Sequence, residues 1–348
     1  MDKIIATMPI KPQGETNIGM LVGPTIMDTL GTILNAEKVF CMNTLNSYKD
    51  VSKNVYTYLN DIKNNGINYN QLFIDEHYAN NIMPILEKML FAGIIKVKNV
   101  EKYLCACGKV DMLSRSVVAN SKLYHFDKGQ IICNCCNMPC RLMTEKSLVL
   151  PLNYSVDSDI SITPSFLQSE ITELTKKFQN TEMLISKKRK TGYAIVYDNQ
   201  VFNIDIDFIW SNYFHKLPGE EQILIASNHQ LFIMYFMNYL AKINSSKKLH
   251  FIATPYLDKS PITNNYFVHD SANYKKLFIL YNLHWKKKDN VWSKSTISYL
   301  NSLDSSQIDL LYQSLIKEAK STKSIDEILM RKINMQNNVK TMKRELLK

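Results

Sequence analysis

The chain lacks a long hydrophobic run. Apolar residues make up 45% of its 348 residues, yet no stretch of about 18 residues is both apolar and uncharged, as a membrane-spanning helix requires. The first residues lead directly into a strand-like segment, without the apolar core of a signal peptide. We therefore expect no membrane association and a cytoplasmic location.

Internal repeats, low-complexity linkers and a recognisable catalytic triad are also missing. No Cys/His or Ser/His/Asp arrangement stands out, and Cys41 lies in an apolar strand-like segment where a buried role is expected. The length permits two domains, or one large α/β domain with an insertion and a helical module.

Acidic residues are scarce in the last third of the chain. The formal net charge is +10, but residues 1–240 hold 23 basic and 23 acidic side chains, whereas residues 241–348 hold 19 basic and 9 acidic. This asymmetry fits a polyanion partner, because clustered lysines release counterions from a phosphate backbone. A lysine-rich solvated helical surface is the alternative, and the sequence leaves both open.

Six of the seven cysteines, in contrast, are concentrated in residues 105–140. Two groups of closely spaced thiolates provide the shell that tetrahedral Zn²⁺ prefers. Disulfides are the rival interpretation, and they need an oxidising compartment. We predict a structural zinc site whose ligands are Cys105, Cys107, Cys136 and Cys140. Cys133 or Cys135 could substitute for one of these ligands.

Apolar periodicity predicts an alternation of strands and helices. Strands are expected at residues 4–9, 38–42, 201–210 and 249–255, and helices at 21–34, 51–63, 80–91, 165–179, 220–243, 270–283 and 305–348. The opening strand, turn at residues 14–19, helix and strand form a β-α-β unit. Such a unit is typical of a parallel sheet whose first turn faces a ligand.

The first turn resembles a known signature. The residues Asn17-Ile18-Gly19-Met20, preceded by Pro9 and Gly14, resemble the HIGH motif of the class I aminoacyl-tRNA synthetases, particularly the methionyl branch. The glycine of the motif is present, whereas both histidines are replaced.

Further segments resemble that family in the correct order over residues 4–285. They are the helix and strand at 83–103 before Cys105, Ile185-Ser186-Lys187 with 192–196, residues 201–207, Ser227-Asn228-His229, and Lys259-Ser260 at the KMSKS position. The resemblance implies a Rossmann-like catalytic domain in two halves, at 1–100 and 151–268. Between them it implies a zinc-knuckle insertion at 101–150, followed by a short basic helical region at 269–348.

The resemblance also implies an activity. Members of the family activate an amino acid with ATP and Mg²⁺ to an adenylate and transfer it to tRNA, mostly by positioning and electrostatics. It assigns catalysis to Asn17, Lys259 and Ser260; ATP binding to Pro9, Gly14, Asn17, Gly19, Asn228, His229 and Lys259; and the substrate pocket to Ile10, Thr44, Asp205, Asp207 and His229. The basic run Lys187, Lys188, Arg189 and Lys190 is a candidate nucleic-acid contact.

Several departures leave the function open. The family aspartate that pairs with the substrate ammonium is matched by Thr44 or Asn43, its tryptophan by Asp205, and its helix-start aspartate by His229. One hypothesis is a retuned enzyme that adenylates an amino acid or related carboxylate for a tRNA or carrier-protein acceptor. The alternative is an inactive paralogue that binds tRNA or protein. About 60 residues follow the resemblance, too few for the family's anticodon-binding bundle.

Overall fold

The computed structural model describes residues 3–12, 16–45, 55–117, 121–153, 160–188, 192–214, 217, 219–227, 230–244, 248–254, 275–276, 279 and 302–322. The expected helix at 270–283 and the tail beyond residue 322 fall almost wholly outside these ranges. All statements below concern the described residues.

A six-stranded parallel sheet forms the centre of the fold, as the sequence predicts. Its strand order is β3-β2-β1-β13-β14-β9, and every neighbouring pair is parallel. The strands are β1 (Lys3–Thr7), β2 (Glu37–Met42), β3 (Gln71–Ile74), β9 (Ser161–Thr163), β13 (Glu221–Ser227) and β14 (Lys248–Thr254). Residues 4–7 of β1 are all buried, as expected for a strand covered on both faces.

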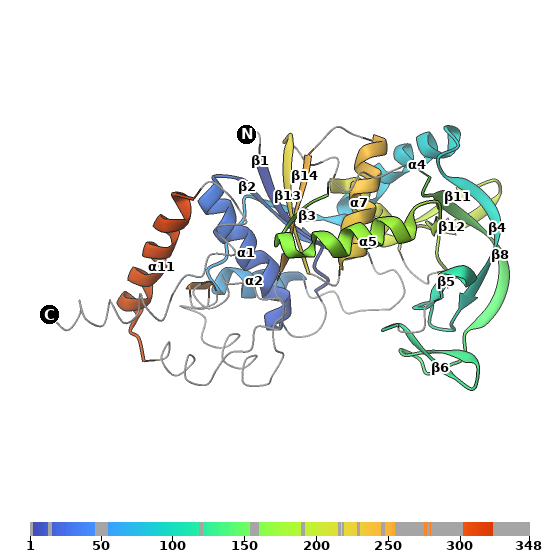
Figure 1. Ribbon diagram of the computed structural model, residues 1–348, viewed down its shortest axis with the longest axis horizontal. Coiled ribbons are helices and arrows are strands. Elements are labelled where there is room, and N and C mark those ends of the chain that lie inside the picture. Colours follow the sequence, from blue (N-terminus) through green and yellow to red (C-terminus); the bar gives the residue numbers. More distant parts are fainter. Residues whose placement is uncertain are drawn as a thin grey trace.

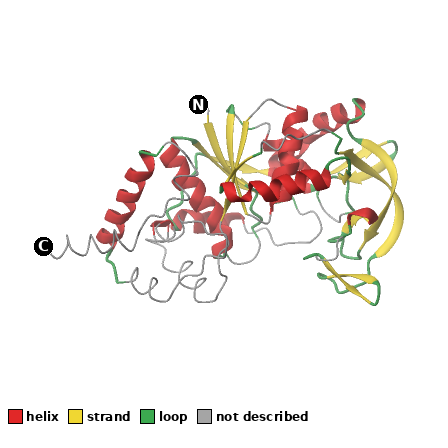
Figure 2. Ribbon diagram, in the orientation of Figure 1, coloured by secondary structure: helices red, strands yellow, loops and turns green. Residues whose placement is uncertain are grey.

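Helices cover both faces of this sheet (Figures 1 and 2). On one face lie α1 (Ile18–Leu34), α2 (Val55–Asn64) and α11 (Ser305–Lys320). The other face carries α4 (Ile82–Phe91), α5 (Gln168–Phe178), α6 (Ile206–Phe214) and α7 (Leu231–Asn244). Each face has its own apolar core, with side chains such as Leu21 and Ile62 in one and Leu86 and Tyr235 in the other. Short helical turns are α3 (Asp75–Tyr78), η1 (Ala79–Asn81), η2 (Ser114–Ser116) and η3 (Ser165–Leu167).

An antiparallel region occupies the opposite end of the molecule from α11 (Figure 1). Its main sheet has the order β10-β8-β4-β5, formed by β10 (Glu182–Leu184), β8 (Arg141–Pro151), β4 (Lys96–Leu104) and β5 (Asp111–Leu113). Two hairpins, β6 (Tyr124–Asp127) with β7 (Gln130–Cys133) and β11 (Ala194–Tyr197) with β12 (Gln200–Asn203), complete it.

A buried cluster of charged side chains connects three strands of this antiparallel sheet. Lys102 on β4 is only 2% exposed, and its Nζ lies 3.1 Å from Asp111 on β5 and 3.0 Å from Glu145 on β8. The Asp111 carboxylate also accepts a hydrogen bond from the backbone N–H of Lys188. Because burying a charge is costly unless it is paired, the three side chains depend on one another.

Helix α11 docks on α1, so part of the expected C-terminal helix covers the sheet domain. Its Asp304 and Gln307 form a capping box, which satisfies the first backbone N–H groups. The apolar side of α11 enters the core on the α1 face, and its buried residues are Ile308, Tyr312, Leu315, Ile316 and Ala319.

A second buried ion pair lies on the same face, on α1. Asp28 is almost fully buried and pairs with Lys38 of β2 at 2.8 Å and with Lys275 at 2.5 Å. Asp28 therefore connects α1 to β2 and to the C-terminal part of the chain.

The predictions for two elements were wrong in part. Residues 201–210 form the end of a short strand followed by the helix α6, because Asp205 accepts a hydrogen bond from the N–H of Asp207 at 2.9 Å and so begins a helix. The segment 220–243 begins with the strand β13 instead of being helical throughout. A short apolar run does not by itself distinguish a buried parallel strand from a helix.

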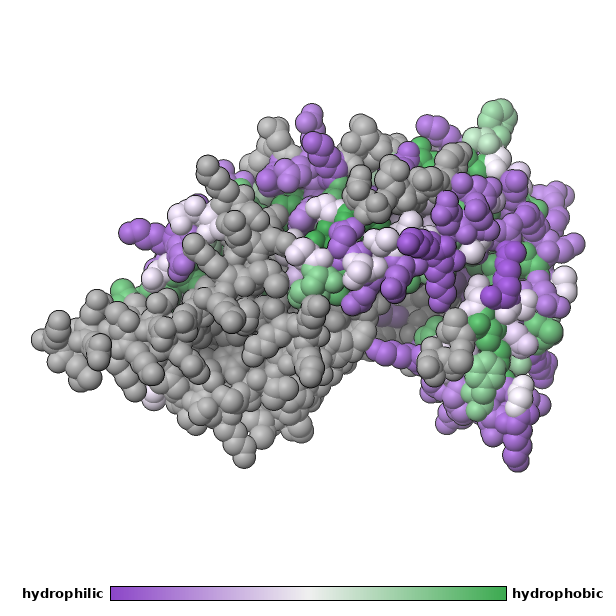
Figure 3. All heavy atoms as spheres, viewed as in Figure 1, coloured by the Kyte–Doolittle hydropathy of each residue, from purple (hydrophilic) through white to green (hydrophobic). Residues whose placement is uncertain are grey.

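No helix in the described part of the chain is both long and apolar enough to cross a bilayer. Hydrophilic residues cover much of the described surface at the insertion end, beside a smaller apolar patch (Figure 3). Exposed apolar residues of the insertion are Leu123, Phe126, Met138 and Leu142.

Candidate functional site

The strand order reverses direction at β1. From this strand the chain proceeds outward through β2 and β3 on one side, whereas β13 and β14 lie on the other. In open parallel sheets, ligands bind at the carboxyl ends of the strands where the order reverses. The loops after β1, β2, β3 and β13 therefore define the candidate site.

The N-terminus of α1 opens at this edge. Asn17 is its N-cap residue in an extended conformation (φ −125°, ψ 164°), and its side chain makes no capping hydrogen bond. Both Asn17 and Gly19 are exposed. A Cβ at position 19 would lie 3.2 Å from Asn17 Oδ1, so glycine leaves this amide room to lie over the first turn. The free N–H groups of a helix start attract anions.

Helix α2 holds this helix start in place. The Thr16 hydroxyl donates to the Asp61 carboxylate, and the Tyr58 hydroxyl donates to the Met20 carbonyl at 2.7 Å. The position of Asn17 is therefore fixed from both sides of the turn.

The loops after β1 and β2 are joined by backbone hydrogen bonds. Ile10 N–H donates to Cys41 at 3.0 Å, and Asn43 N–H donates to the Ile10 carbonyl at 2.9 Å. The structure thus brings Ile10 and Thr44, two predicted pocket residues, to the same edge. Pro9 is half-buried beside them.

Sequence reasoning missed Asp75, which follows β3 at this edge. Its side chain is fully buried, and its Oδ1 accepts hydrogen bonds from the N–H and hydroxyl of Thr44, at 2.8 and 3.0 Å. A carboxylate directly after the apolar segment Leu72–Ile74 was the available signal, but the resemblance pointed to the end of β2.

Asp205 and Asp207 lie at the start of α6, not on the strand that the sequence analysis predicted. Asp205 is buried at the start of α6 and pairs with Lys187, so this predicted pocket carboxylate and this predicted nucleic-acid lysine contact each other. Lys188 is exposed while its backbone N–H is bonded to Asp111. The other predicted site residues lie outside the described part of the chain: Gly14, Arg189, Lys190, Asn228, His229, Lys259 and Ser260.

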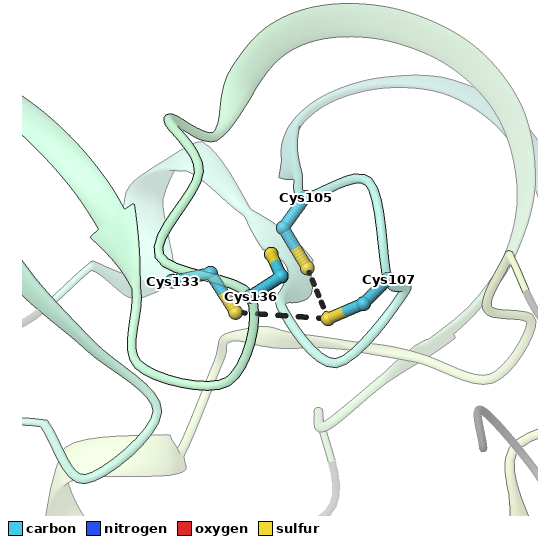
Figure 4. A group of neighbouring side chains, drawn as sticks. All are labelled: Cys105, Cys107, Cys133 and Cys136. Carbon is cyan, nitrogen blue, oxygen red and sulfur yellow. Dashed lines mark hydrogen bonds between the residues drawn. The ribbon is translucent and has the colours of Figure 1, made fainter.

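Four cysteines gather in the antiparallel region. The thiol sulfurs of Cys105, Cys107, Cys133 and Cys136 all lie within 4.8 Å of one another (Figure 4). The predicted ligand Cys140 is not in this group, and Cys133, named in the sequence analysis as a substitute, takes its place.

Two similar turns present the thiols. The N–H of Cys105 donates to the carbonyl of Val110, and the N–H of Cys133 donates to the carbonyl of Met138, both at 3.0 Å. Backbone N–H groups also point at sulfur, from Val110 to Cys105 Sγ at 3.2 Å and from Cys135 to Cys133 Sγ at 3.4 Å. Such bonds stabilise thiolates, the form that binds metal.

The spacing of the sulfurs fits a metal. A tetrahedral Zn²⁺ with four Zn–S bonds of about 2.3 Å separates its sulfurs by roughly 3.8 Å. In the structure, Cys107 Sγ lies 3.4 Å from Cys105 Sγ and 3.8 Å from Cys133 Sγ. These four residues therefore fit a structural zinc.

The thiols also have unequal acidity. Burial acts against ionisation at Cys136, but hydrogen bonds from backbone N–H groups and neighbouring thiols outweigh it and lower the pKa to about 7. Burial and the neighbouring thiolates raise the pKa of Cys140 to about 12. Burial also raises the pKa of Cys107 and of Cys133, which belong to the group, so the position of its sulfur, not its acidity, separates Cys140 from the other four.

Solved structures of methionyl-tRNA synthetase share this fold. The Mycobacterium tuberculosis enzyme in complex with methionyl-adenylate superposes with a TM-score of 0.66 at 11% identity, over 88% of this chain and 69% of that one. A second structure of that enzyme bound by methionyl-adenylate gives 0.58 at 11% identity, over 95% and 88%. Its free state gives 0.60 at 12% identity, over 87% and 66%. No family model and no curated protein matches the sequence.

The fold is therefore that of a class I synthetase-like protein, with a parallel Rossmann-like sheet and a cysteine-bearing insertion. Methionyl-tRNA synthetase is a protein whose solved structures have this fold. At 11–12% identity the likeness establishes the fold, and the predicted fold class is confirmed.

Proposed function

We propose that the protein is an ATP-dependent ligase-type enzyme that activates an amino acid or related carboxylate as an adenylate. The observation that carries the proposal is the open N-terminus of α1 at the point where the strand order reverses. Its backbone N–H groups and the uncommitted Asn17 amide suit a phosphate group.

Each part of the site has a role in this proposal. Asn17 donates to a phosphate, Gly19 leaves space for the nucleotide, and Lys259 with Ser260 contacts the departing pyrophosphate as the resemblance implies. Ile10 and Thr44 line the pocket that holds the acyl substrate. Mg²⁺ would accompany ATP, and zinc would hold the insertion through its thiolates.

The acceptor is also part of the proposal. The neighbours are tRNA synthetases by name, and exposed lysines such as Lys188 and Lys317 suit a polyanion. A tRNA would be held through phosphates and shape rather than by base readout. An acidic carrier protein would suit the same charges.

A second candidate is a binding protein without catalysis. Met20 replaces a hydrogen-bonding residue at the end of the first signature, and losing one such donor costs on the order of 100–1,000-fold in rate. An inactive protein would keep its basic surface but would no longer bind ATP.

Calorimetric titration with ATP and Mg²⁺, paired with an amino-acid-dependent pyrophosphate exchange screen, separates the two candidates. Binding with exchange supports the enzyme and identifies its substrate. Absence of binding at millimolar ATP contradicts the proposal and favours the binding protein.

Two variants test the assignment of roles in an exchange assay. Lys259→Ala should lower the exchange rate more than Asn17→Ala, because a full positive charge on the leaving pyrophosphate stabilises more than a neutral amide does. Equal losses would argue against a phosphate role for Lys259.

A further inference from the structure

Asp111, the first residue of β5, directly follows one of the turns that present the thiols. The preceding residue, Val110, donates its N–H to Cys105 Sγ at 3.2 Å, and its carbonyl accepts from the N–H of Cys105 at 3.0 Å. Both bonds belong to the turn that carries Cys105 and Cys107 (Figure 4). The position of Asp111 is therefore set by a turn whose thiols belong to the candidate metal site.

The buried carboxylate of Asp111 bonds to a segment that is distant in the sequence. It accepts a hydrogen bond from the backbone N–H of Lys188, 77 positions further along the chain. The side chain of Asp111 has no exposed surface. A charged acceptor makes a stronger hydrogen bond than a neutral one. Asp111 thus attaches the backbone of Lys188 to the cysteine-bearing insertion.

Lys187, the preceding residue, is attached to a different part of the fold. Its N–H donates to the carbonyl of Asn203 on β12 at 2.8 Å, and its ammonium pairs with Asp205 at the start of α6. The side chain of Lys188 is exposed, and among the described residues no carboxylate pairs with it. The charge of Lys187 is therefore neutralised within the protein, whereas the charge of Lys188 faces solvent.

We infer that Lys188 contacts the phosphate backbone of an RNA and that Asp111 positions it, so that RNA binding depends on metal in the neighbouring thiol site. The inference rests on the proposed function and deepens it, because it assigns part of the acceptor surface. A structural metal stabilises the residues around it. Metal held by Cys105 fixes the turn, the turn fixes Asp111, and Asp111 fixes the backbone that carries Lys188.

The competing explanation is that buried ion pairs hold Asp111 without help from the metal. Lys102 lies 3.1 Å from Asp111 and 3.0 Å from Glu145, and neither contact involves a thiol. In that case removal of the metal would leave Lys188 unchanged. The two explanations therefore differ in whether the N–H of Lys188 responds to the metal.

Amide hydrogen exchange of the zinc-loaded and the chelated protein, resolved by NMR, measures this response. We expect exchange at Lys188 to become about tenfold or more faster after chelation, as for the loss of one charge-assisted hydrogen bond. The N–H of Lys187, which is bonded to Asn203, should change by less than about threefold. The N–H of Met8 donates to the carbonyl of Ile225 at 2.7 Å and reports on the parallel sheet. An unchanged rate at Lys188, or a loss of protection at Met8 as well, overturns the inference.

Binding of the zinc-loaded protein to a short synthetic RNA duplex, measured over a range of salt concentrations, tests the role of Asp111. Lys188→Met should weaken binding and reduce the slope of log K against log salt by about 1. Asp111→Asn should act in the same direction, although removal of a carboxylate by itself favours a polyanion. Asp198→Asn, in the exposed turn between β11 and β12, makes the same charge change and should not weaken binding. If Asp111→Asn binds RNA as Asp198→Asn does, the inference is overturned.

If Asp111→Asn does not fold, as judged by circular dichroism, the chelated parent decides. Its affinity for RNA must fall together with the protection of Lys188, and an unchanged affinity overturns the inference. A Lys188→Met variant that loses affinity for poly-L-glutamate but not for RNA indicates an acidic protein partner and overturns the phosphate assignment. These measurements use neither ATP nor an amino acid, so adenylation can fail while the positioning of Lys188 stands.

Discussion

At the scale of single residues, four neighbouring thiols cannot readily all be ionised unless a cation lies between them. Ionising one thiol opposes ionisation of the next, and a divalent metal removes that opposition. The composition of the thiol group therefore sets which cysteines the metal needs.

We predict one zinc per chain in the parent protein, its loss in Cys133→Ser, and its retention in Cys140→Ser. Cys133 belongs to the group of thiols within 4.8 Å, whereas Cys140 does not. Metal content by mass spectrometry and the melting temperature measure both effects. Equal zinc loss in the two variants, or a metal-free parent of unchanged melting temperature, would contradict the assignment.

Two glycines of α1 differ sharply in the space around them. A Cβ at Gly31 would lie 2.4 Å from Cγ of Lys38 and 3.0 Å from Ile5, whereas at Gly23 the nearest atom is 3.9 Å away. Lys38 would have to move, although it pairs with the buried Asp28.

Gly31→Ala should therefore lower the free energy of unfolding by about 1–3 kcal/mol through overpacking. Gly23→Ala, the control in the same helix, should change the free energy of unfolding by less than about 1 kcal/mol, because the gain in helix propensity is opposed by the contact of the new Cβ with the ring of Pro24, the next residue. Urea denaturation measures both. The same response at both positions would mean that close packing against Lys38 is unimportant.

At the scale of elements, strand β10 is held by two cations. Glu182 pairs with Lys98 of β4 and with Arg115 of η2. Burial by itself would raise the pKa of Glu182, but these two partners outweigh it and lower the pKa. A carboxyl whose pKa is lowered on folding stabilises the protein above its unfolded pKa, and this contribution disappears as the pH falls through the folded pKa.

Glu182→Gln should cost about 1–2 kcal/mol at pH 7, and its difference from the parent should shrink below about pH 4. The exposed pair of Lys146 and Asp198 provides the control, because Asp198→Asn should change stability by less than about 1 kcal/mol at either pH. Thermal melts between pH 3 and 7 give the comparison. A cost for Glu182→Gln that does not depend on pH would refute the ionic origin.

The elements also show what the sequence could predict. The β-α-β start, the strand near residue 250 and α5 follow from periodicity, which burial on one or two faces imposes. Strand β13 could not be predicted from periodicity, because its apolar run is short and is followed closely by the apolar helix α7. Asp205 could not be assigned to a helix start without knowing that its carboxylate accepts from Asp207.

Site residues were harder to predict because they meet only in space. The two Cys turns were visible as spacing, but the choice between Cys133 and Cys140 depends on how the turns face each other. Asp75 lies 31 positions from its partner Thr44, and no local pattern connects them.

At the scale of the whole molecule, the cluster of Lys102, Asp111 and Glu145 connects the insertion to the chain that returns to the parallel sheet. Lys102→Met would leave two carboxylates without their cation, and we expect a loss of about 3–5 kcal/mol. Lys96→Met, at the exposed first position of the same strand, is the matched control and should cost less than about 0.5 kcal/mol.

Chemical denaturation measures this pair of variants, and the triple variant Lys102→Met/Asp111→Asn/Glu145→Gln should recover part of the loss because no buried charge remains. A similar loss from Lys96→Met, or no recovery in the triple variant, would show that charge burial is not the cause.

The central position of β1 has a consequence for synthesis on the ribosome. Lys3 pairs with Glu221 in β13, so β1 is synthesised long before β13 and cannot have both its edges covered until β13 has been translated. The antiparallel insertion, whose strands are neighbours in sequence, can close earlier, and its two Cys turns can bind metal while the parallel sheet is still open. The nascent protein therefore passes through a stage with a folded insertion and an exposed apolar strand, when protection by a chaperone matters most.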